Sequence, residues 1–387
     1  MSEAGEKSKS PEELGKQVLQ DLKRGDLHRT LKRDLTDLYD FYLTGEERVA
    51  LSKMGRVKRW LVLIWWLLRG LFLKLPPLRR LLLLLALLCL LFGSVGFTVG
   101  QNTRFGFDVA PVGVGLLLVI LMLELKDKLL AKDELAVGRA VQLALMPGGC
   151  PQIPGWDAWF YTRPANDVGG DLVDCLEAAE GCWGLVLGDV SGKGLGAALL
   201  MAKLQSTLRA VATEHRDLAG LGSRVNRILC RDGLPGKFAT LAYLEVQAES
   251  GRVRLLNAGH LPPLVRQEGR TTSLKPVAPP LGVLPEAVYQ EQTVDVEPGG
   301  LLLVYSDGLT DAHDEAWRFF GEERLAALLP ALDGLGAEAA GARILAAVDG
   351  FVGDERPFDD LSLVLLRRRP PGGGPPASAA GTPTPRG

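Results

Sequence analysis

The sequence predicts an α+β domain that follows a pair of membrane-spanning helices. Residues 81–100 carry no charge over twenty positions, the length needed to cross the hydrocarbon core of a bilayer, and a second uncharged run follows at 109–123. Farther along, residues 150–366 alternate strand-like and helix-like segments, and several strands follow one another across short Gly/Pro turns. Helices grouped between blocks of strands are typical of an α+β domain in which a sheet packs under helices.

Residues 1–56 form an N-terminal region that we expect to be cytoplasmic and partly helical. The first ten residues are polar, and we expect them to be disordered. Apolar residues then recur in steps of three and four, the spacing of an amphipathic helix with Asp26 as its N-cap: Leu27, Leu31, Leu35, Leu38 and Tyr42. This stripe suits docking onto the catalytic domain or pairing of two chains, and a purely structural role is the favoured interpretation.

Residues 57–125 are interpreted as an interfacial helix followed by two transmembrane helices, 81–100 and 109–125. Nine basic residues and no acidic residue lie between Arg48 and Arg80, and basic residues recur after the second run. The positive-inside rule then places both termini in the cytoplasm, as for a multi-pass protein of the inner membrane. Residues 60–75 contain Arg69 and Lys74, so an interfacial position suits them better than a span. For the second run, a core helix of a soluble protein remains an alternative.

The remaining segments flank or fill the catalytic part. Residues 126–149 are helical in composition and stop at a Pro-Gly-Gly sequence, which predicts a linker helix; the domain follows at 150–367. The Pro/Gly-rich tail, 368–387, is predicted to be disordered. A net charge of −2 gives no indication of a general nucleic-acid binder. Five scattered cysteines without a CxxC pair fit a reducing compartment.

Acidic residues stand where apolar runs end. Asp189 closes WGLVLGDVSGKG, Asp307 closes LLLVYSDG, and Asp359 opens FDDLSLVLL, while Asp171 and Asp174 lie upstream in NDVGGDLVD. Buried strands do not normally end in bare carboxylates unless a cation is present. Oxygen ligands with no Cys or His among them suit Mg²⁺ or Mn²⁺. Each acid alone is more readily a turn residue or a cap, but together they favour a metal site.

Seven motifs give the sequence a resemblance to a known family. They are NDVGGDLVD, GDVSGKGLGAALLMA, NAGHLPP, PLGVLPEAVY, LLLVYSDGLTDA, FFGEERL and FDDLSLVLL. In this order they resemble the PPM-type serine/threonine phosphatases, and more closely the SpoIIE/RsbU-like bacterial branch. The resemblance covers about 230 residues and leaves the first 125 outside. It implies a β-sandwich flanked by helix layers, with a centre of two Mn²⁺ or Mg²⁺ ions at one edge.

The resemblance also assigns roles to individual residues. It implies that Asp189 bridges the two metals and that Asp189 and Asp307 are the catalytic pair. The implied metal ligands are Asp171 (directly or through water), Asp189, the Val190 carbonyl, Asp307 and Asp359, with Asp360 and Asp174 as further candidates. A turn-capping role is the alternative for Asp360.

Some positions depart from the family pattern. Leu172 and Val173 replace an aromatic pair, and Ser362 stands for the usual Thr. Ser191 stands where the eukaryotic relatives have a histidine able to protonate the leaving group, so that proton donor is unassigned. His260, in NAGHLPP, is interpreted as a histidine that fixes its loop. Arg163 and Lys193 are candidates for contacting phosphate, with an ordinary surface role as the default.

These observations predict a membrane-anchored, metal-dependent protein Ser/Thr phosphatase. Attack by a hydroxide bound to the dinuclear metal centre would release phosphate from a regulatory phosphoprotein without a phospho-enzyme intermediate. The resemblance implies an anti-sigma-factor antagonist as partner, and a homodimer formed through the linker helix. The alternative is a catalytically weak phosphatase-fold binding module in a partner-switching pathway. A membrane sensor is disfavoured because the connector between the spans is only eight residues long.

Overall fold

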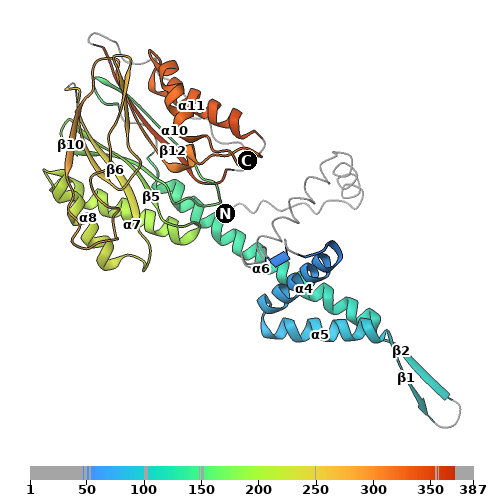
Figure 1. Cartoon of the computed structure of the whole chain (residues 1–387). Helices are drawn as coiled ribbons and strands as arrows, with labels where there is room; N and C mark the ends of the chain where they lie inside the picture. The colour runs from blue at the N-terminus through green and yellow to red at the C-terminus, as the bar shows by residue number, and fades with distance from the viewer. Residues whose placement is uncertain are drawn as a thin grey trace, which may run out of the picture. The chain divides into compact units, whose positions relative to one another are not determined.

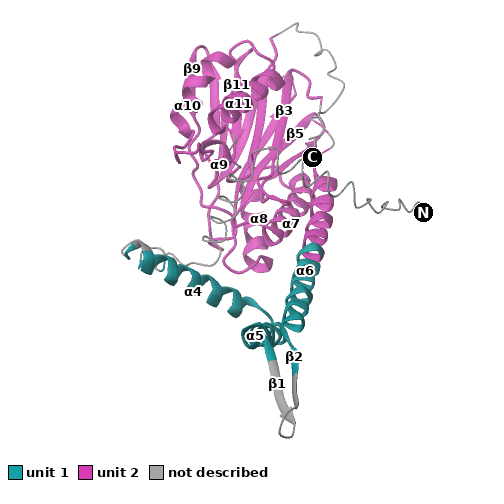
Figure 2. Cartoon of the chain, turned by 90° about the vertical axis from the view of Figure 1, so that its right-hand side faces the viewer, with its two compact units in different colours: residues 1–129 teal, residues 130–387 magenta. Residues whose placement is uncertain are grey.

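A computed structural model of the chain describes residues 47, 50–51, 54–99, 103–147, 149, 152–248, 250–353, 355 and 357–370. The polar start, the helix expected at 27–42 and the tail from 371 onward lie outside these residues. The chain divides into two compact units, residues 1–129 and 130–387 (Figure 2). The boundary falls within one long helix, α6 (Ala110–Leu145).

Unit 1 does not contain the expected helix over residues 81–100. After α4 (Arg56–Lys74), α5 (Pro77–Phe92) ends early because Gly93 takes a left-handed φ of 59°. The following residues form strand β1 (Ser94–Val99), which pairs antiparallel with β2 (Thr103–Asp108). The prediction of a helical hairpin is therefore wrong for its first member. Among the described residues, no helix combines the length and the hydropathy required to cross a membrane.

The helix α6 joins two segments that the sequence analysis treats separately. Its 36 residues include all of the second uncharged run except Val109, and most of the predicted linker, without a break. It ends at Leu145, just before the Pro147 at which the sequence predicts a stop. The segment predicted as an interfacial helix, residues 60–75, lies largely within α4.

Unit 2 contains two five-stranded antiparallel sheets (Figure 1). In spatial order the first sheet is β10 (Glu291–Asp295), β7 (Arg252–Ala258), β6 (Ala239–Gln247), β5 (Cys182–Val190) and β4 (Leu172–Ala179). The second sheet is β3 (Trp156–Arg163), β12 (Leu361–Arg368), β11 (Leu301–Tyr305), β8 (Leu264–Gln267) and β9 (Arg270–Ser273).

Helices cover the outer face of each sheet. The helices α7 (Leu195–Val211) and α8 (Leu218–Asp232) pack on the first sheet, whereas α10 (Gly321–Leu328) and α11 (Ala337–Val352) lie over the second (Figure 1). Short helical turns complete the chain: η1 (Ala212–Glu214), α9 (Asp307–Thr310) and η2 (Leu329–Leu332). The α+β sandwich flanked by helix layers is thus confirmed.

The strands bury side chains on both of their faces. In β5, Leu185 and Leu187 face the core between the sheets, and Val186 and Val190 face the core under α7 and α8. In β11, Leu302 belongs to the core between the sheets and its neighbours belong to the core under α10 and α11. Such two-sided burial explains why these strands read as continuous apolar runs, and why a charged residue at their ends is conspicuous.

Candidate metal centre

The first sheet delivers two aspartates to one of its ends. Leu172 of β4 pairs with Gly188 of β5, so Asp171, just before β4, stands opposite Asp189 near the end of β5. Asp171 is 3% exposed and Asp189 is half-buried. On the other side of β5, Asp189 pairs with Thr240 of β6. Antiparallel register therefore brings together two acids that are 18 positions apart in the chain.

The second sheet delivers its acids by the same geometry. Tyr305, the last residue of β11, pairs with Leu363 of β12, so the chain leaves β11 at Asp307 beside the point where Asp359 and Asp360 enter β12. Ser306 fixes this crossing, because its backbone N–H donates to the Ser362 carbonyl (3.0 Å) and its hydroxyl donates to the Asp360 carbonyl (2.9 Å).

A glycine permits the close approach at this crossing. A Cβ at Gly308 would strike the backbone carbonyl of Asp360, so the turn after Asp307 tolerates no side chain at that position. The glycine of the SDG sequence thus has a steric reason, independent of any chemistry at the site.

The acids of the two sheets lie within electrostatic reach of one another. Burial raises the pKa of Asp189 to about 7, and Asp307 and Asp359 add to the rise. Burial, followed by the charge of Asp359, also raises the pKa of Asp307. Burial raises the pKa of Asp171 well above its ordinary value, with a contribution from Asp189. Several carboxylates that disfavour one another's ionisation mark a place where positive charge is lacking.

The donor set suits a hard divalent cation in its chemistry. All of these ligand candidates offer oxygen, and Oδ2 of Asp171 is buried without a hydrogen-bond partner. Among the described residues, no three His, Cys, Asp or Glu side chains are close enough together to hold an ion. Lys193 supplies positive charge here: its Nζ lies 3.0 Å from Oδ2 of Asp359 and donates to the Phe358 carbonyl (2.7 Å).

The two further ligand candidates, Asp360 and Asp174, are hydrogen-bonded to other groups of the protein. Oδ1 of Asp360 accepts from the backbone N–H of Ala165 (2.7 Å), and Oδ2 accepts from that of Gly170 (2.5 Å). Asp360 therefore fixes the loop that carries Asp171, as its turn-capping alternative predicts. Both oxygens of Asp174 accept from the Arg209 guanidinium, at 2.6 and 2.8 Å, so the structure does not bring Asp174 together with the other acids.

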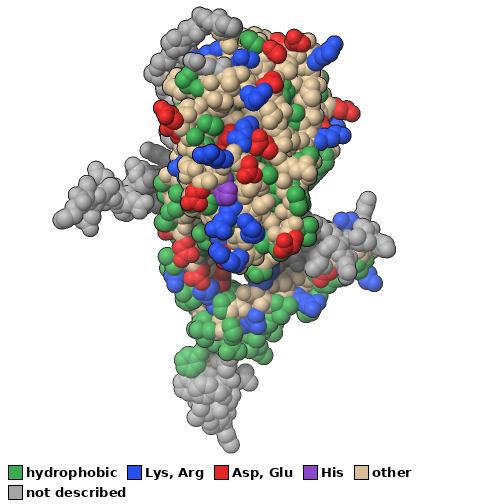
Figure 3. Space-filling model, turned by 90° about the vertical axis from the view of Figure 1, so that its left-hand side faces the viewer, with side chains coloured by type: hydrophobic (Ala, Val, Ile, Leu, Met, Phe, Trp, Pro, Cys, Tyr) green, Lys and Arg blue, Asp and Glu red, His purple; other side chains and the backbone are tan. Residues whose placement is uncertain are grey.

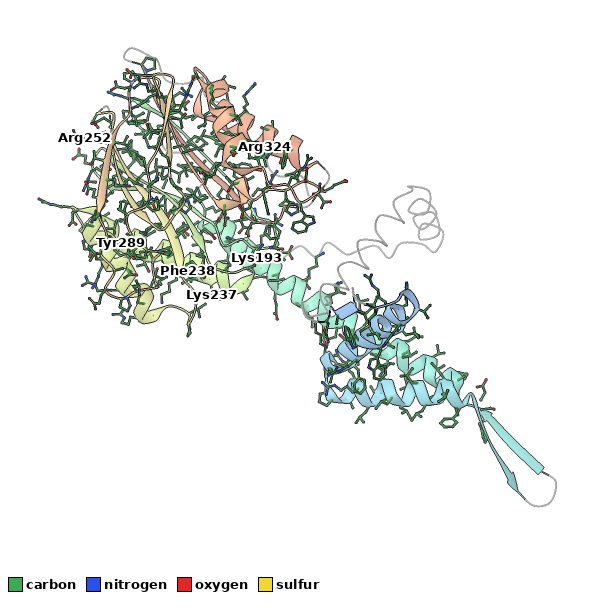
Figure 4. All side chains as sticks on the ribbon, viewed as in Figure 1. Lys193, Lys237, Phe238, Arg252, Tyr289 and Arg324 are labelled. Atoms are coloured by element: carbon green, nitrogen blue, oxygen red, sulfur yellow. The ribbon has the colours of Figure 1, made fainter. Side chains whose placement is uncertain are left out.

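The loop after β5 places the remaining ligand candidate, the Val190 carbonyl. A Cβ on Gly170 would lie 3.0 Å from this oxygen, so the carbonyl faces the loop that carries Asp171. Ser191 closes the loop against Phe238, because its hydroxyl accepts from the Phe238 N–H and its N–H donates to the Phe238 carbonyl, both at 2.9 Å. Figure 4 shows Lys193 and Phe238 at the same end of unit 2. The proton donor for the leaving group stays unassigned.

His260 connects strands β6 and β7 next to the metal centre. Its ring Nδ1 lies 2.8 Å from the hydroxyl of Thr240, the partner of Asp189, and its backbone N–H donates to Oδ1 of Asn257 (2.8 Å). Burial lowers its pKa to about 4, so the ring is neutral at pH 7. This is the loop-fixing role that the sequence favoured.

Arg163, a candidate for contacting phosphate, forms an ion pair with Asp349 (2.7 Å).

Comparison with known proteins places this geometry in a family. Residues 179–369 match the family model of stage II sporulation protein E (SpoIIE). Unit 2 carries a SpoIIE-type PP2C phosphatase domain. The domain is 29% identical over 226 residues to protein IcfG of Synechocystis (51% of this chain, 36% of that protein). It is 25% identical over 164 residues to phosphoserine phosphatase RsbP of Bacillus subtilis (41% of each chain). The chain thus matches less than two thirds of the length of each of these relatives.

A solved structure shows the same fold. The SiaA-PP2C domain of Pseudomonas aeruginosa superposes with a TM-score of 0.54 at 18% identity, covering 62% of this chain and 98% of that domain. At that identity the likeness concerns the fold alone. The SpoIIE-type domain therefore accounts for the sandwich and its helix layers, while the roles of individual acids stay predictions.

The sequence analysis missed one contact of the SpoIIE-type domain. Gln142 of α6 is 4% exposed; its Nε2 donates to the Gly169 carbonyl (2.9 Å), and its Oε1 accepts from the Gly169 N–H (3.1 Å). Gly169 lies two positions before Asp171, so α6 is hydrogen-bonded to the backbone next to the acids. A glutamine within an otherwise apolar helix face is the only sequence signal of this contact.

Proposed function

We propose that the SpoIIE-type domain is a metal-dependent phosphatase that releases phosphate from Ser or Thr of a protein. The observation that carries the proposal is the meeting of four aspartates from two sheets, with the pKa of three of them raised and with Lys193 paired to the fourth. Two findings support it: the domain belongs to a phosphatase family, and the relative RsbP is a phosphoserine phosphatase. Phosphatases of the PP2C family depend on Mn²⁺ or Mg²⁺.

The residues divide the work by position. Two bound ions would supply an activated water for in-line attack and would neutralise phosphate oxygens. In this proposal Asp189 would be the ligand shared by both ions, Asp307 and Asp359 would hold them from the second sheet, and Asp171 with the Val190 carbonyl would hold them from the first. Asp360 keeps the Asp171 loop in place through its backbone hydrogen bonds.

Hydrolysis of p-nitrophenyl phosphate by the full chain tests this proposal. We expect activity that requires Mn²⁺ or Mg²⁺ and that falls about a thousandfold in Asp189→Ala and Asp307→Ala, since each metal contributes several kcal/mol. Asp295→Ala, which removes an exposed carboxylate from β10, serves as the matched control and should keep full activity. Equal activity in all four proteins would sink the metal proposal. An inert wild type that still binds a phosphoprotein would favour the binding module.

We also propose that the substrate is a regulatory phosphoprotein of a partner-switching circuit and that two chains pair through α6. Gln142 would let such pairing affect the site, because it connects that helix directly to the backbone beside Asp171. Light scattering of the full chain should report a dimer that is lost on deletion of residues 1–137. A monomer at micromolar concentration contradicts the pairing.

Unit 1 is further proposed to hold the domain at the inner face of the cytoplasmic membrane. Hydrophobic side chains gather at its surface (Figure 3), including Trp60 and Trp65 of α4 and Leu81 and Leu91 of α5, each at least 65% exposed. Basic residues of α4 and α5 suit anionic headgroups. Co-sedimentation with anionic lipid vesicles tests this proposal, and protein that remains entirely in the supernatant refutes it.

A further inference from the structure

A hollow of about 280 Å³ opens directly beside the acids of the metal centre. It shares Asp359 and Gly308 with that centre, and its other walls come from the end of α11 and the loops before β12 and after α9. The side chains that give it an apolar lining are Ala312, Val348, Val352, Pro357, Phe358 and Leu361. The lining is mixed, because polar side chains also face the hollow: Arg163, His313, Asp349, Glu355 and Asp359. A hollow of this size takes one side chain or a small ligand.

Three of the four charged side chains that line the hollow form ion pairs, and the fourth, Glu355, is exposed. Arg163 is bound to Asp349 at 2.7 Å, and Asp359 to Lys193 at 3.0 Å. Lys193 also lies over the Phe358 ring, 4.5 Å from its centroid. An anionic occupant would meet the carboxylates of Asp349, Glu355 and Asp359, and a cationic one would compete with Arg163 and Lys193 for them. An apolar occupant disturbs neither ion pair, so the pairing favours an apolar occupant over a charged one.

Aromatic side chains form the rim of the hollow. The His313 ring stacks on Trp317 with centroids 4.2 Å apart, and Phe358 lies 5.6 Å from His313. Trp317 is 66% exposed and Phe358 is 48% exposed, so the rim offers apolar surface that the fold itself does not use. We call the hollow and its rim the aromatic pocket: the lining residues above together with His313 and Trp317.

The rim residue Trp317 has a strained backbone conformation. Trp317 has a φ of 57°, a region that a bulky residue rarely adopts. Asp314 holds it there: the Asp314 carbonyl accepts from the Trp317 N–H (2.9 Å), and Oδ1 of Asp314 accepts from the N–H groups of Ala316 and Arg318, both at 3.0 Å. Backbone strain that supports an exposed aromatic residue next to a reaction centre points to a binding role.

We propose that the aromatic pocket binds a large apolar side chain of the phosphoprotein substrate, within about three residues of the phosphorylated Ser or Thr. The inference rests on the proposed function, because the phosphorylated residue fixes one end of the bound segment at the acids. The pocket begins at Asp359, and an extended chain advances about 3.3 to 3.6 Å per residue, so only near neighbours in sequence reach it. The pocket thereby selects among phosphoproteins.

Short phosphoserine peptides with the full chain and Mn²⁺ test this inference. A single Phe, Lys or Glu is moved through the three positions on each side of phosphoserine in an alanine background. The readout is kcat/KM for each peptide divided by that for the all-alanine peptide. Wild type should prefer Phe at one or two positions by about tenfold or more, the discrimination that an apolar pocket gives.

Two variants assign the preference to the pocket. Val352→Trp fills the hollow from the end of α11, and Trp317→Ala removes an exposed part of the rim. Both should reduce the Phe preference to about twofold or less. The control Val288→Trp introduces the same Val-to-Trp change at a position that is 72% exposed and outside the pocket. It should leave the Phe preference intact. If Val352→Trp fails to fold, Trp317→Ala decides.

The outcomes separate this inference from the function on which it rests. Absence of metal-dependent hydrolysis of p-nitrophenyl phosphate and of every peptide defeats the proposed function. Hydrolysis with no preference, or with a preference for Lys or Glu, overturns only the apolar pocket. A Phe preference that survives in Trp317→Ala and in folded Val352→Trp overturns it as well.

Discussion

Two clusters of acids in the SpoIIE-type domain differ in what opposes their charge. On the first sheet, Glu245 and Glu291 share Arg254, whose guanidinium lies 2.6 Å from a carboxylate oxygen of each. Acidic and basic side chains are intermixed over the face of unit 2 that carries β10 (Figure 3). At the metal centre, no guanidinium of the described part of the chain pairs with Asp189 or Asp307, and the ion pair that Lys193 forms there is with Asp359.

The difference separates structural acids from acids that await a ligand. Arg254 lowers the pKa of Glu291 and opposes the rise that burial gives the pKa of Glu245. The pKa of Asp307, by comparison, is raised by burial and by its acidic neighbours. The protein thus supplies a close basic partner to both acids of one cluster, whereas in the other Lys193 is paired with Asp359 and the pKa of Asp189 and Asp307 stays raised. Burial of a carboxylate by itself is not the signal, since Glu245 is 5% exposed and Asp189 only half-buried. The missing partner is the signal.

The largest effect is expected from Asp189→Asn, which keeps the shape of the side chain and removes its charge. Hydrolysis of p-nitrophenyl phosphate should fall about a thousandfold, because the residue would no longer bridge the metals. In EDTA, however, the free energy of unfolding should stay the same or rise, because the substitution relieves repulsion among Asp189, Asp307 and Asp359. Urea unfolding measures the second quantity. A marked loss of stability in EDTA would place Asp189 among the structural acids.

The same contrast explains which parts of the site the sequence predicted. Asp189, Asp307 and Asp359 were identifiable because each borders an apolar run, the first two closing it and Asp359 opening it, which is a local pattern. The sandwich followed from the order of strands and helices and from the family resemblance. What the sequence could not predict depends on partners distant in the chain. Arg209 neutralises Asp174 from 35 positions away, and no local pattern distinguishes Asp174 from Asp171.

The N-terminal part shows the opposite failure, in which a local pattern misled. The uncharged run at 81–100 has the composition of a spanning helix, yet the helix ends at Phe92 and the next residues pair as a strand. Gly93 and the β-prone residues after it decide the outcome, because glycine takes the left-handed conformation and Val, Phe and Thr suit strands. Hydropathy averaged over a window does not register a single helix-ending residue.

His260 provides a third kind of buried group, which is neutral and therefore requires no counter-charge. Burial lowers its pKa from 6.5 to about 4, so between pH 6.5 and 4 the unfolded chain binds a proton that the folded chain does not. Stability should therefore be complete above pH 6.5 and decline as the pH falls, by up to about 3 kcal/mol at pH 4. Urea unfolding in EDTA of wild type and His260→Gln at pH 7 and pH 4 isolates this contribution. Parallel losses in both proteins would show that His260 does not cause it.

The smallest effect tests the compensated cluster through Arg254→Met, which retains much of the apolar stem. Glu245 would then be buried without its counter-charge, and we expect a loss of about 2 kcal/mol. This is less than the 3 to 5 kcal/mol typical of a fully buried pair, because Arg254 is 30% exposed. The matched control, Arg252→Met, breaks an exposed pair with Asp295 and should cost about 0.5 kcal/mol or less.

Adding Glu245→Gln to Arg254→Met should restore part of the lost stability, because it removes the charge that was left unpaired. Phosphatase activity should change less than about twofold in all of these variants, since the cluster lies outside the metal centre. Urea unfolding and p-nitrophenyl phosphate hydrolysis measure the two quantities side by side. A loss of activity without a loss of stability in Arg254→Met would reverse the assignment, because an acid cluster that serves only the fold has no means of changing the rate of the reaction while the fold is intact.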